Sequence, residues 1–232
     1  MNIKTVIMCH NTPVSTKKLY KQLSEVGHVD VFDSGSDKDK KPDCPCETFE
    51  NLYWTGCWKE AMKRYGDSDF LWVLGGDVLL ENETWTYYEI MEDAIKYNIG
   101  LWSPAVNGSC RGVMSKNTAK GKAWSVYHVE GIAMAASKRL MEEMGRDFPP
   151  GNKLGWGVDV WMSMVGWEKG MMNIIDGRVS IAHPFVRGYD SQRAWDEMSL
   201  YMENVLGKEW KTRVKMSVKD DFDLNIRKQS EG

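Results

Sequence analysis

The alternation of short apolar runs with segments of helical hydrophobic spacing constrains the fold of this chain most strongly. The run TVIMC (5–9) is brief, rich in β-branched residues and without the period-two alternation of a half-exposed strand, so it predicts a buried strand. The next segment has Pro13 where a first helical turn would lie, and Leu19 and Leu23 at helical spacing. Strand–helix alternation of this kind is typical of α/β domains, in which helices flank a mostly parallel central sheet.

The same signals predict the rest of the secondary structure. Apolar runs predict strands at 29–32, 70–74, 99–102, 131–136, 171–175 and 179–183. Helical spacing and N-cap residues predict helices at 47–65, 82–95, 137–144, 158–169 and 190–206. Glycine, proline and charged residues predict loops at 105–123 and 145–157.

A single domain is the economical interpretation of this pattern, because no internal repeat or low-complexity segment divides it. We expect a domain over 1–189, with a nucleotide-binding half at about 1–104 and an acceptor-binding and catalytic half at about 105–189. A C-terminal helix and tail are expected at 190–232.

The composition narrows the class of protein. The 232 residues are 42% hydrophobic, enough for a substantial core, and their formal net charge of −3 gives no support for nucleic-acid binding. The five cysteines are odd in number and scattered, which disfavours a disulfide framework and indicates a reducing compartment. We see no signal peptide and no apolar stretch long enough to cross a bilayer, so we expect a cytoplasmic protein without a membrane span.

Polar residues and glycines follow three of the predicted strands. Asn11 comes after the first strand, Asp33 after the second, and Gly75, Gly76 and Asp77 after the third. Ligands of open α/β sheets bind outside the carboxyl ends of the strands, so these residues are candidates for a binding site. Asp77 is the one carboxylate in the otherwise apolar FLWVLGGDVLL, and such a group needs a partner or a metal. The glycine-rich dinucleotide motif and the P-loop are both absent from the sequence.

Four segments between Thr5 and Pro184 carry a family pattern in a fixed order. DSGS (33–36) would form a turn after the second strand, and LGGDVLL (74–80) would end the third. They are followed by GIAMAASKRLMEEMGRDF (131–148) and by GWGVDVWMSMVGWEKGMMNIIDGRVSIAHP (155–184). Together they resemble the family-2-type glycosyltransferases with the GT-A fold. The resemblance implies an α/β fold with a single GT-A-type domain built on a mostly parallel, Rossmann-like central sheet.

The resemblance also implies roles for particular residues. Asp33 would accept hydrogen bonds from the base or ribose of a nucleotide. Asp77 would bind Mn²⁺ or Mg²⁺, with His183 as a further ligand or a diphosphate contact. Asp159 would be the catalytic base that removes a proton from the acceptor hydroxyl. One base and one metal imply a single displacement, with inversion at the sugar.

Four other residues are expected at the substrates. Asn11, Gly75 and Gly76 would lie against the nucleotide, and Trp156, between two glycines, is a candidate for stacking on a sugar or base. The expected donor is a nucleoside-diphosphate sugar, in the first place a UDP-sugar. The acceptor would be a glycan, a small molecule or a modified nucleic acid.

Three positions depart from the family pattern. Gly75 replaces the first acid of the D-x-D motif, Val158 replaces the glutamate of the G-E-D stretch, and Trp161 replaces an aspartate that follows it. These departures keep open a nucleotide- or glycan-binding protein without turnover. The acid-free basic segment 105–123 keeps open a lid over the donor, a solvated loop, or a contact to nucleic acid in an enzyme that glycosylates a hydroxylated base.

The four residues that are given roles by the resemblance also have purely structural interpretations. Asp77 would cap a turn through its side chain, and Asp33 would form an Asx-type turn. Asp159 would be a favourable charge near a helix N-terminus. His183 would be a histidine whose ring is satisfied within the fold.

Overall fold

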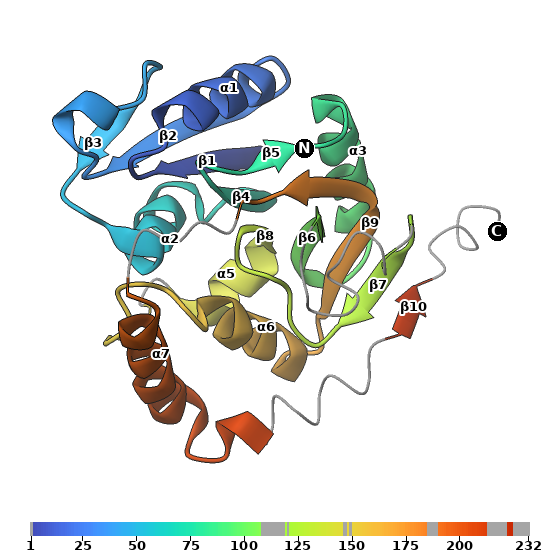
Figure 1. Ribbon diagram of the computed structural model, residues 1–232. Helices are drawn as coiled ribbons and strands as arrows, with labels where there is room; N and C mark the ends of the chain where they lie inside the picture. The colour runs from blue at the N-terminus through green and yellow to red at the C-terminus, as the bar shows by residue number, and fades with distance from the viewer. Residues whose placement is uncertain are drawn as a thin grey trace.

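The computed structural model describes residues 2–107, 119, 121–145, 148, 150–184 and 190–212, together with the backbone of 222–224. One central sheet carries helices on both of its faces (Figure 1). The strands are β1 (Ile3–Cys9), β2 (His28–Ser34), β3 (Glu47–Phe49), β4 (Phe70–Gly75), β5 (Leu79–Leu80), β6 (Ile99–Asn107), β7 (Ala123–Val126), β8 (Ala133–Ser137), β9 (Met172–Ala182) and β10 (Phe222–Leu224). The helices are α1 (Pro13–Ser24), the short 3-10 helix η1 (Lys38–Lys40), α2 (Tyr53–Tyr65), α3 (Thr84–Ile95), α5 (Lys138–Met144), α6 (Val158–Glu168) and α7 (Ser191–Leu206).

The sheet has a parallel half and a mixed half. Its strand order is β10-β7-β9-β6-β8-β4-β1-β2-β3, and β5 pairs with β9. Strands β3, β2, β1 and β4 run parallel, as the strand–helix alternation predicts. Strand β8 is antiparallel to its neighbours β4 and β6, because it starts beside the end of β4, where the Gly75 N–H donates to the Ile132 carbonyl (3.0 Å). The predicted parallel arrangement is therefore confirmed for the first half of the chain, and the second half is mixed.

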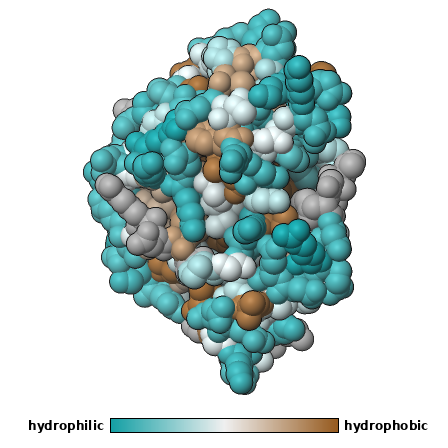
Figure 2. Space-filling view, turned by 90° about the vertical axis from the view of Figure 1, so that its left-hand side faces the viewer, coloured by the Kyte–Doolittle hydropathy of each residue, from teal (hydrophilic) through white to brown (hydrophobic). Residues whose placement is uncertain are grey.

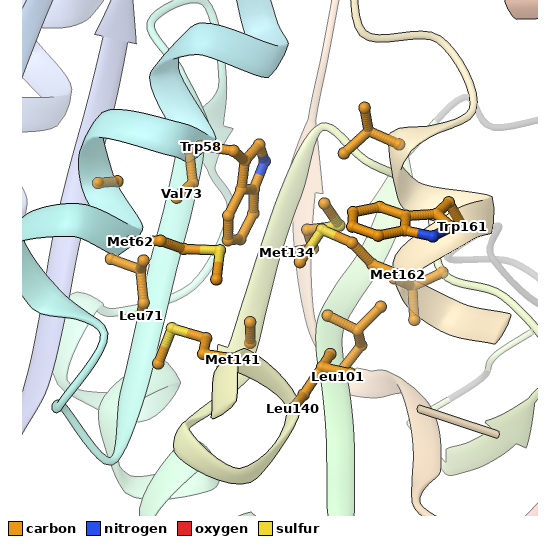
Figure 3. Packing of buried hydrophobic residues seen from close by; sticks show 14 of the residues in the cluster. Trp58, Met62, Leu71, Val73, Leu101, Met134, Leu140, Met141, Trp161 and Met162 are labelled. Carbon is orange, nitrogen blue, oxygen red and sulfur yellow. The ribbon is translucent and has the colours of Figure 1, made fainter. Parts of the chain in front are cut away.

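Two apolar clusters, one on each face of the sheet, hold the layers together. Helices α1 and α3 cover one face, and α2, α5, α6 and α7 contribute to the other. Figure 3 shows the second cluster, in which Trp58 of α2 and Trp161 of α6 point toward strand residues such as Met134. Burial of a large apolar side chain is worth roughly 1.5–3 kcal/mol, so these two layers supply much of the driving force for folding. Helix α7 starts beyond the expected boundary at 189, yet Tyr201 and Met202 are fully buried in this cluster.

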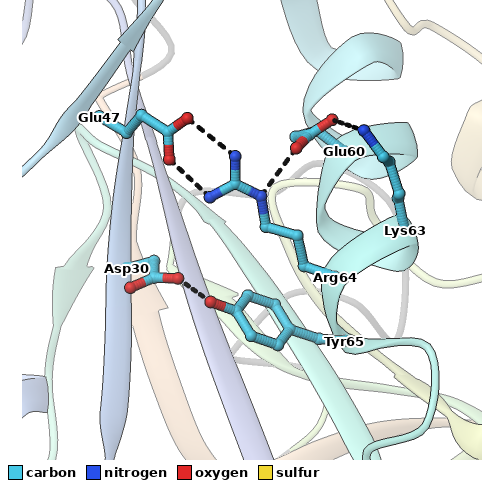
Figure 4. A network of polar contacts seen from close by, with 6 residues as sticks. All are labelled: Asp30, Glu47, Glu60, Lys63, Arg64 and Tyr65. Atoms are coloured by element: carbon cyan, nitrogen blue, oxygen red, sulfur yellow. Dashed lines mark hydrogen bonds and ion pairs between the residues drawn. The ribbon is translucent and has the colours of Figure 1, made fainter.

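The helix predicted at 47–65 is shorter than expected. Residues Glu47–Phe49 form the edge strand β3, and α2 begins at Tyr53. The two η nitrogens of Arg64 donate to the carboxylate of Glu47 (2.6 and 2.9 Å), and its Nε donates to Glu60 (2.7 Å), which ties α2 to β3 (Figure 4). The sequence of β3 is short and polar, so its pairing depends on neighbours rather than on its own pattern.

Strands β6 and β9 are longer than predicted. Strand β6 continues through Pro104, because a register shift in the β6–β9 ladder falls directly after that residue and proline is tolerated at such irregularities. The two strands predicted at 171–175 and 179–183 are the single strand β9, which contains a bulge between Asp176 and Ser180.

Strand β7 lies at the end of the predicted loop 105–123 and pairs with β9. Residues 108–118 and 120 of that loop, with most of its basic side chains, lie outside the described residues. Within the described ranges, no helix is both long and apolar enough to cross a bilayer. Figure 2 views the side on which β3 and α2 lie, and hydrophilic residues cover most of it, with hydrophobic residues in separate small patches.

Candidate functional site

The loops that follow β1, β2 and β4 meet at the carboxyl edge of the parallel half of the sheet. Cys9 at the end of β1 is paired with Asp33 of β2, and the preceding residue of β1, Met8, is paired with Gly75 of β4. The Gly76 N–H donates to the Met8 carbonyl (2.8 Å). The structure thus brings together the strand ends that the sequence marks as a binding site.

Asp33 and Asn11 shape the first part of this edge. The Asp33 carboxylate is fully buried; it accepts the Ser36 N–H (3.1 Å) through Oδ1 and the Thr48 hydroxyl (3.3 Å) through Oδ2. Asn11 has a left-handed backbone (φ 58°), and its side-chain oxygen accepts the Asp37 N–H (2.8 Å). The bond from Ser36 to Asp33 is the one expected if Asp33 forms an Asx-type turn. Together with the bond to Asn11, it fixes the backbone of the turn at 34–36.

Ser34 connects this turn to the start of α2. Its hydroxyl donates to Asn51 Oδ1 (3.1 Å) and accepts the N–H groups of Leu52 (2.8 Å) and Tyr53 (3.2 Å). The Ser34 carbonyl lies 2.8 Å from Nδ1 of His10, so the ring is oriented by the turn. Among the described residues, Asn11 and Tyr53 are the non-glycine positions with positive φ, and both contact this segment. Strained backbone is frequent at functional sites.

His10, Asn51 and Tyr53 also belong to this edge, although no motif in the sequence marks them as site residues. Tyr53 sits within a helical pattern, and no sequence signal marks a tyrosine for the left-handed region. His10 is a single histidine after a strand, and no motif around it marks a function.

Gly76 allows the end of β4 to press against the first turn of α1. A Cβ atom at this position would lie 2.4 Å from the Thr16 hydroxyl and 2.7 Å from the Thr12 hydroxyl. The Thr16 hydroxyl instead donates to the Gly76 carbonyl (3.2 Å). Gly75 is less crowded, since its Cβ would meet Asp77 Oδ1 at 3.0 Å. The two glycines therefore set the position of Asp77 through close backbone packing.

Asp77 and His183 lie side by side, although they are far apart in the sequence. The Asp77 Oδ2 and His183 Nε2 atoms are 3.2 Å apart, and the side chains are 27% and 17% exposed. Pairing of β5 with β9, with Leu79 opposite Ala182, brings the two segments together. Both of the residues proposed as metal ligands thus converge on one partly exposed point of the sheet edge.

The donor atoms of this pair fit a divalent cation that keeps open positions. Within the described part of the chain, no group of three or more His, Cys, Asp or Glu side chains converges to form a closed metal centre. A carboxylate oxygen and an imidazole nitrogen suit Mn²⁺, and Mg²⁺ is typically held by one or two carboxylates with substrate phosphates and water. Asp77 and His183 would therefore hold such an ion only together with a diphosphate.

Asp159 lies in the first turn of α6 and faces the start of β8. Its Oδ1 accepts the Val160 N–H (2.9 Å) and its Oδ2 accepts the Gly131 N–H (3.1 Å). A Cβ atom at Gly131 would lie 3.1 Å from the Asp159 Cβ, so the glycine allows this close approach. Because the Ile132 carbonyl accepts the Gly75 N–H (3.0 Å), the segment at 131–132 joins Asp159 to the loop that carries Asp77.

Trp156 lies in the loop that leads into α6. The Asn152 side chain accepts the Gly155 N–H (2.8 Å) and donates to the Trp156 carbonyl (2.7 Å). Gly155 and Gly157 have φ of 85° and 84°, a region that other residues rarely adopt. The half-buried Trp156 is therefore held by an ordered turn, three residues before Asp159.

Comparisons with known structures identify the fold. The chain superimposes on GalNAc-T7 crystallised with UDP, GalNAc and Mn²⁺, with a TM-score of 0.68 at 13% identity over 91% of this chain and 49% of that one. It also superimposes on residues 1–349 of S. aureus TarS in complex with UDP-GlcNAc (TM-score 0.60, 14% identity, 89% and 68% of the chains). The chain thus has the GT-A fold implied by its motifs.

A third similar structure is glucosyl-3-phosphoglycerate synthase from Mycobacterium tuberculosis with Mg²⁺ and UDP (TM-score 0.61, 13% identity, 89% of this chain and 79% of that one). This chain spans about half the length of the GalNAc-T7 chain that it matches. No protein-family model and no curated protein matches the sequence.

Proposed function

We propose that this protein is a metal-dependent glycosyltransferase that moves a sugar from a nucleoside-diphosphate sugar to an acceptor hydroxyl. The observation that carries the proposal is the contact between Asp77 and His183 (3.2 Å) at the carboxyl edge of a GT-A-type sheet. Asp159 lies at the same edge, joined to Asp77 through the segment at 131–132. A carboxylate and an imidazole that can hold a metal ion, and a separate carboxylate that can act as a base, are the groups that metal-dependent sugar transfer would use.

Each group has a distinct role in the proposed reaction. Asp77 and His183 hold the cation, which when bound stabilises the negative charge on the departing diphosphate. Asp159 accepts the proton of the acceptor hydroxyl as its oxygen attacks the anomeric carbon. The N–H groups of Gly131 and Val160 orient the Asp159 carboxylate (3.1 and 2.9 Å). Trp156 is proposed to lie on the acceptor side, where its indole would stack on a sugar ring.

The nucleotide is proposed to bind at the ends of β1 and β2. Asn11, which follows β1, and Gly75 and Gly76, at the neighbouring end of β4, would lie against the nucleotide, while the buried Asp33 acts through the turn that it forms rather than by an exposed oxygen. A single base without a second carboxylate nucleophile predicts inversion at the sugar. NMR of the anomeric proton of the product would contradict this assignment by showing retention.

Similar structures support the choice of donor and ion. GalNAc-T7, TarS and the mycobacterial synthase were crystallised with UDP or a UDP-sugar, and two of them with Mn²⁺ or Mg²⁺. A UDP-sugar with Mn²⁺ or Mg²⁺ is therefore the first donor and ion to test. The acceptor is a glycan, a small molecule or a modified nucleic acid, and the reaction is proposed to take place in the cytoplasm, where nucleotide sugars are made.

Hydrolysis of a panel of UDP-sugars, with and without Mn²⁺, tests the proposal. Wild-type protein should release UDP in a Mn²⁺-dependent manner, and Asp77→Asn and Asp159→Asn should each lower turnover by about 10²–10⁴-fold. Asp67→Asn, at an exposed aspartate before β4, is the matched control and should leave turnover unchanged. Equal turnover in all four proteins would refute the mechanism.

One departure from the family pattern favours a second candidate, a binding protein without turnover. Gly75 takes the place of a second carboxylate beside Asp77. Calorimetric binding of UDP with no sugar release during long incubation would favour that candidate over the enzyme.

A further inference from the structure

Helix α7 is bonded to the loop at 150–157 through one carboxylate. Oε2 of Glu197 accepts the N–H groups of both Lys153 and Leu154, each at 3.1 Å. Oε1 of the same side chain accepts Nε of Arg193 (3.0 Å), one helical turn earlier. Glu197 is 19% exposed, so these bonds form in a partly desolvated position. One side chain thus fixes two consecutive backbone groups of a loop that has no regular secondary structure.

Apolar contacts join α7 to the other end of the same loop. A Cβ atom at Gly157 would lie 2.9 Å from Cγ of Met198 and 3.1 Å from the sulfur of Met202. Met202 is fully buried, so this face of α7 is fixed by the core. Since Gly157 immediately precedes α6, α7 contacts the loop at the point where the helix carrying Asp159 begins. Figure 1 shows α7 alongside α6.

The position of this loop determines the positions of Trp156 and Asp159, the two residues proposed to lie on the acceptor side. Asn152 bonds to both Gly155 (2.8 Å) and Trp156 (2.7 Å), and it lies directly before the pair that Glu197 holds. Gly155 packs against Trp54 of α2, where a Cβ would meet the Trp54 Cβ at 2.5 Å. Little freedom remains for this backbone, because it is bonded on one side and closely packed on the other.

The charge of Glu197 strengthens the arrangement. Partial burial opposes its ionisation, but the N–H of Leu154, the guanidinium of Arg193 and the N–H of Lys153 outweigh that cost, so the pKa of Glu197 is held below its ordinary value. Hydrogen bonds to an ionised acceptor are about twice as strong as neutral ones.

We propose that Glu197 is a positioning residue of the active site, and that α7 is a working part of the acceptor side rather than an appended tail. Glu197 holds the loop at 152–157 so that Trp156 and Asp159 keep the orientation that the acceptor requires. The inference rests on the proposed glycosyltransferase function for its catalytic part, and on the hydrogen bonds alone for its structural part.

Amide hydrogen exchange tests the structural part without reference to any activity. In Glu197→Ala, the amides of Lys153 and Leu154 should exchange at least about tenfold faster than in the wild type, because both lose a charged acceptor. Glu197→Gln keeps a carbonyl acceptor and should restore slow exchange to within a few fold. Asp196→Ala, at an exposed neighbour bonded to Gln192 of its own helix (2.9 Å), is the control and should leave both amides unchanged. Unchanged exchange in Glu197→Ala would overturn the inference, whatever the activity.

Kinetics tests the catalytic part. Glu197→Ala should lower kcat for UDP-sugar turnover by about 10–100-fold, as a misplaced catalytic group does, while the Kd for UDP with Mn²⁺ stays within about twofold. Glu197→Gln should recover most of kcat. A parallel loss of UDP affinity, or a kcat equal to that of the wild type, would overturn the positioning role. If the wild type turned over no nucleotide sugar but the Glu197→Ala amides exchanged faster as expected, the proposed function would fail. The structural role of Glu197 in holding the loop at 152–157 would still stand.

Discussion

A methyl group at Gly76 should disturb both the stability and the nucleotide site of this protein. The added Cβ would lie 2.4 Å from Thr16 Oγ1, 2.7 Å from Thr12 Oγ1 and 3.0 Å from the Met8 carbonyl oxygen. Real Cβ contacts are not this short, so the threonine hydroxyls and the first turn of α1 must move. Thr16 is fully buried, and its neighbours leave little space for such a shift.

The size of the effect follows from the contacts that would be lost. Overpacking of this kind costs about 1–3 kcal/mol. The hydrogen bond from Thr16 to the Gly76 carbonyl (3.2 Å) is worth about 1 kcal/mol. Against this, replacing glycine with alanine lowers the entropy of the unfolded chain and returns about 0.4–1 kcal/mol. We therefore expect Gly76→Ala to lower the free energy of unfolding by about 2 kcal/mol.

Urea denaturation followed by tryptophan fluorescence measures this change, provided that the m-value stays constant. The matched variant is Thr16→Ala, which removes the hydroxyl at 2.4 Å. The double variant should be more stable than the sum of the two single changes predicts, by at least about 0.5 kcal/mol. A Gly76→Ala protein that unfolds at the wild-type urea concentration, with no coupling to Thr16, would refute the packing argument.

Three further predictions concern the base and the edge of the sheet. Asp159→Asn should lower kcat by about 10²–10⁴-fold with little change in UDP affinity, and loss of affinity instead would assign Asp159 to nucleotide binding. Gly131→Ala places a Cβ 3.1 Å from the Asp159 Cβ, so kcat should fall by about tenfold or more while calorimetry shows normal UDP binding. Arg64 holds the pKa of Glu47 below its ordinary value, so this pair stabilises the fold above about pH 4.5 and stops doing so as the pH falls through the lowered pKa. Glu47→Gln should therefore cost about 0.5 kcal/mol of unfolding free energy at pH 6 and nothing at pH 2, as measured by urea denaturation; an equal loss at both pH values would contradict this assignment.

The parallel half of the sheet was predictable because its strands are continuous apolar runs. The run at 70–74 lies within the observed β4, and the strand at 5–9 lies within β1. Because parallel strands end at one edge, the sequence also placed Asp33 and Asp77 at the same edge of the sheet. Local pattern and tertiary structure agree in this region.

The second half of the sheet was harder to predict, because its pairing is set by contacts distant in sequence. Strand β7 has only four residues and forms against β9. Pro104 suggests a strand end, yet the register shift beside it lets β6 continue to Asn107. The bulge between Asp176 and Ser180 divides one strand into two apparent runs. Short strands and bulges leave little periodicity to detect.

In the candidate site, too, some features could be predicted from the local sequence and others depend on tertiary contacts. His183 was assigned by resemblance alone, and its contact with Asp77 depends on the two-residue pairing of β5 with β9. The sequence contains no local sign that Gly131 supports Asp159, or that Tyr53 adopts a left-handed backbone. The role proposed for Glu197 depends equally on a tertiary contact, since the loop residues Lys153 and Leu154 that it bonds are 44 and 43 positions away.

Calorimetry of UDP binding tests most directly the claim that Asp77 and His183 hold a divalent ion together with a diphosphate. The wild type should bind UDP at least about tenfold more tightly with Mn²⁺ than without it, because the ion joins the two protein ligands to the phosphates. Asp77→Asn and His183→Ala should each remove most of this Mn²⁺ effect, and Asp67→Asn should retain it. Equal UDP affinity with and without Mn²⁺ in the wild type, unchanged by either substitution, would contradict the account.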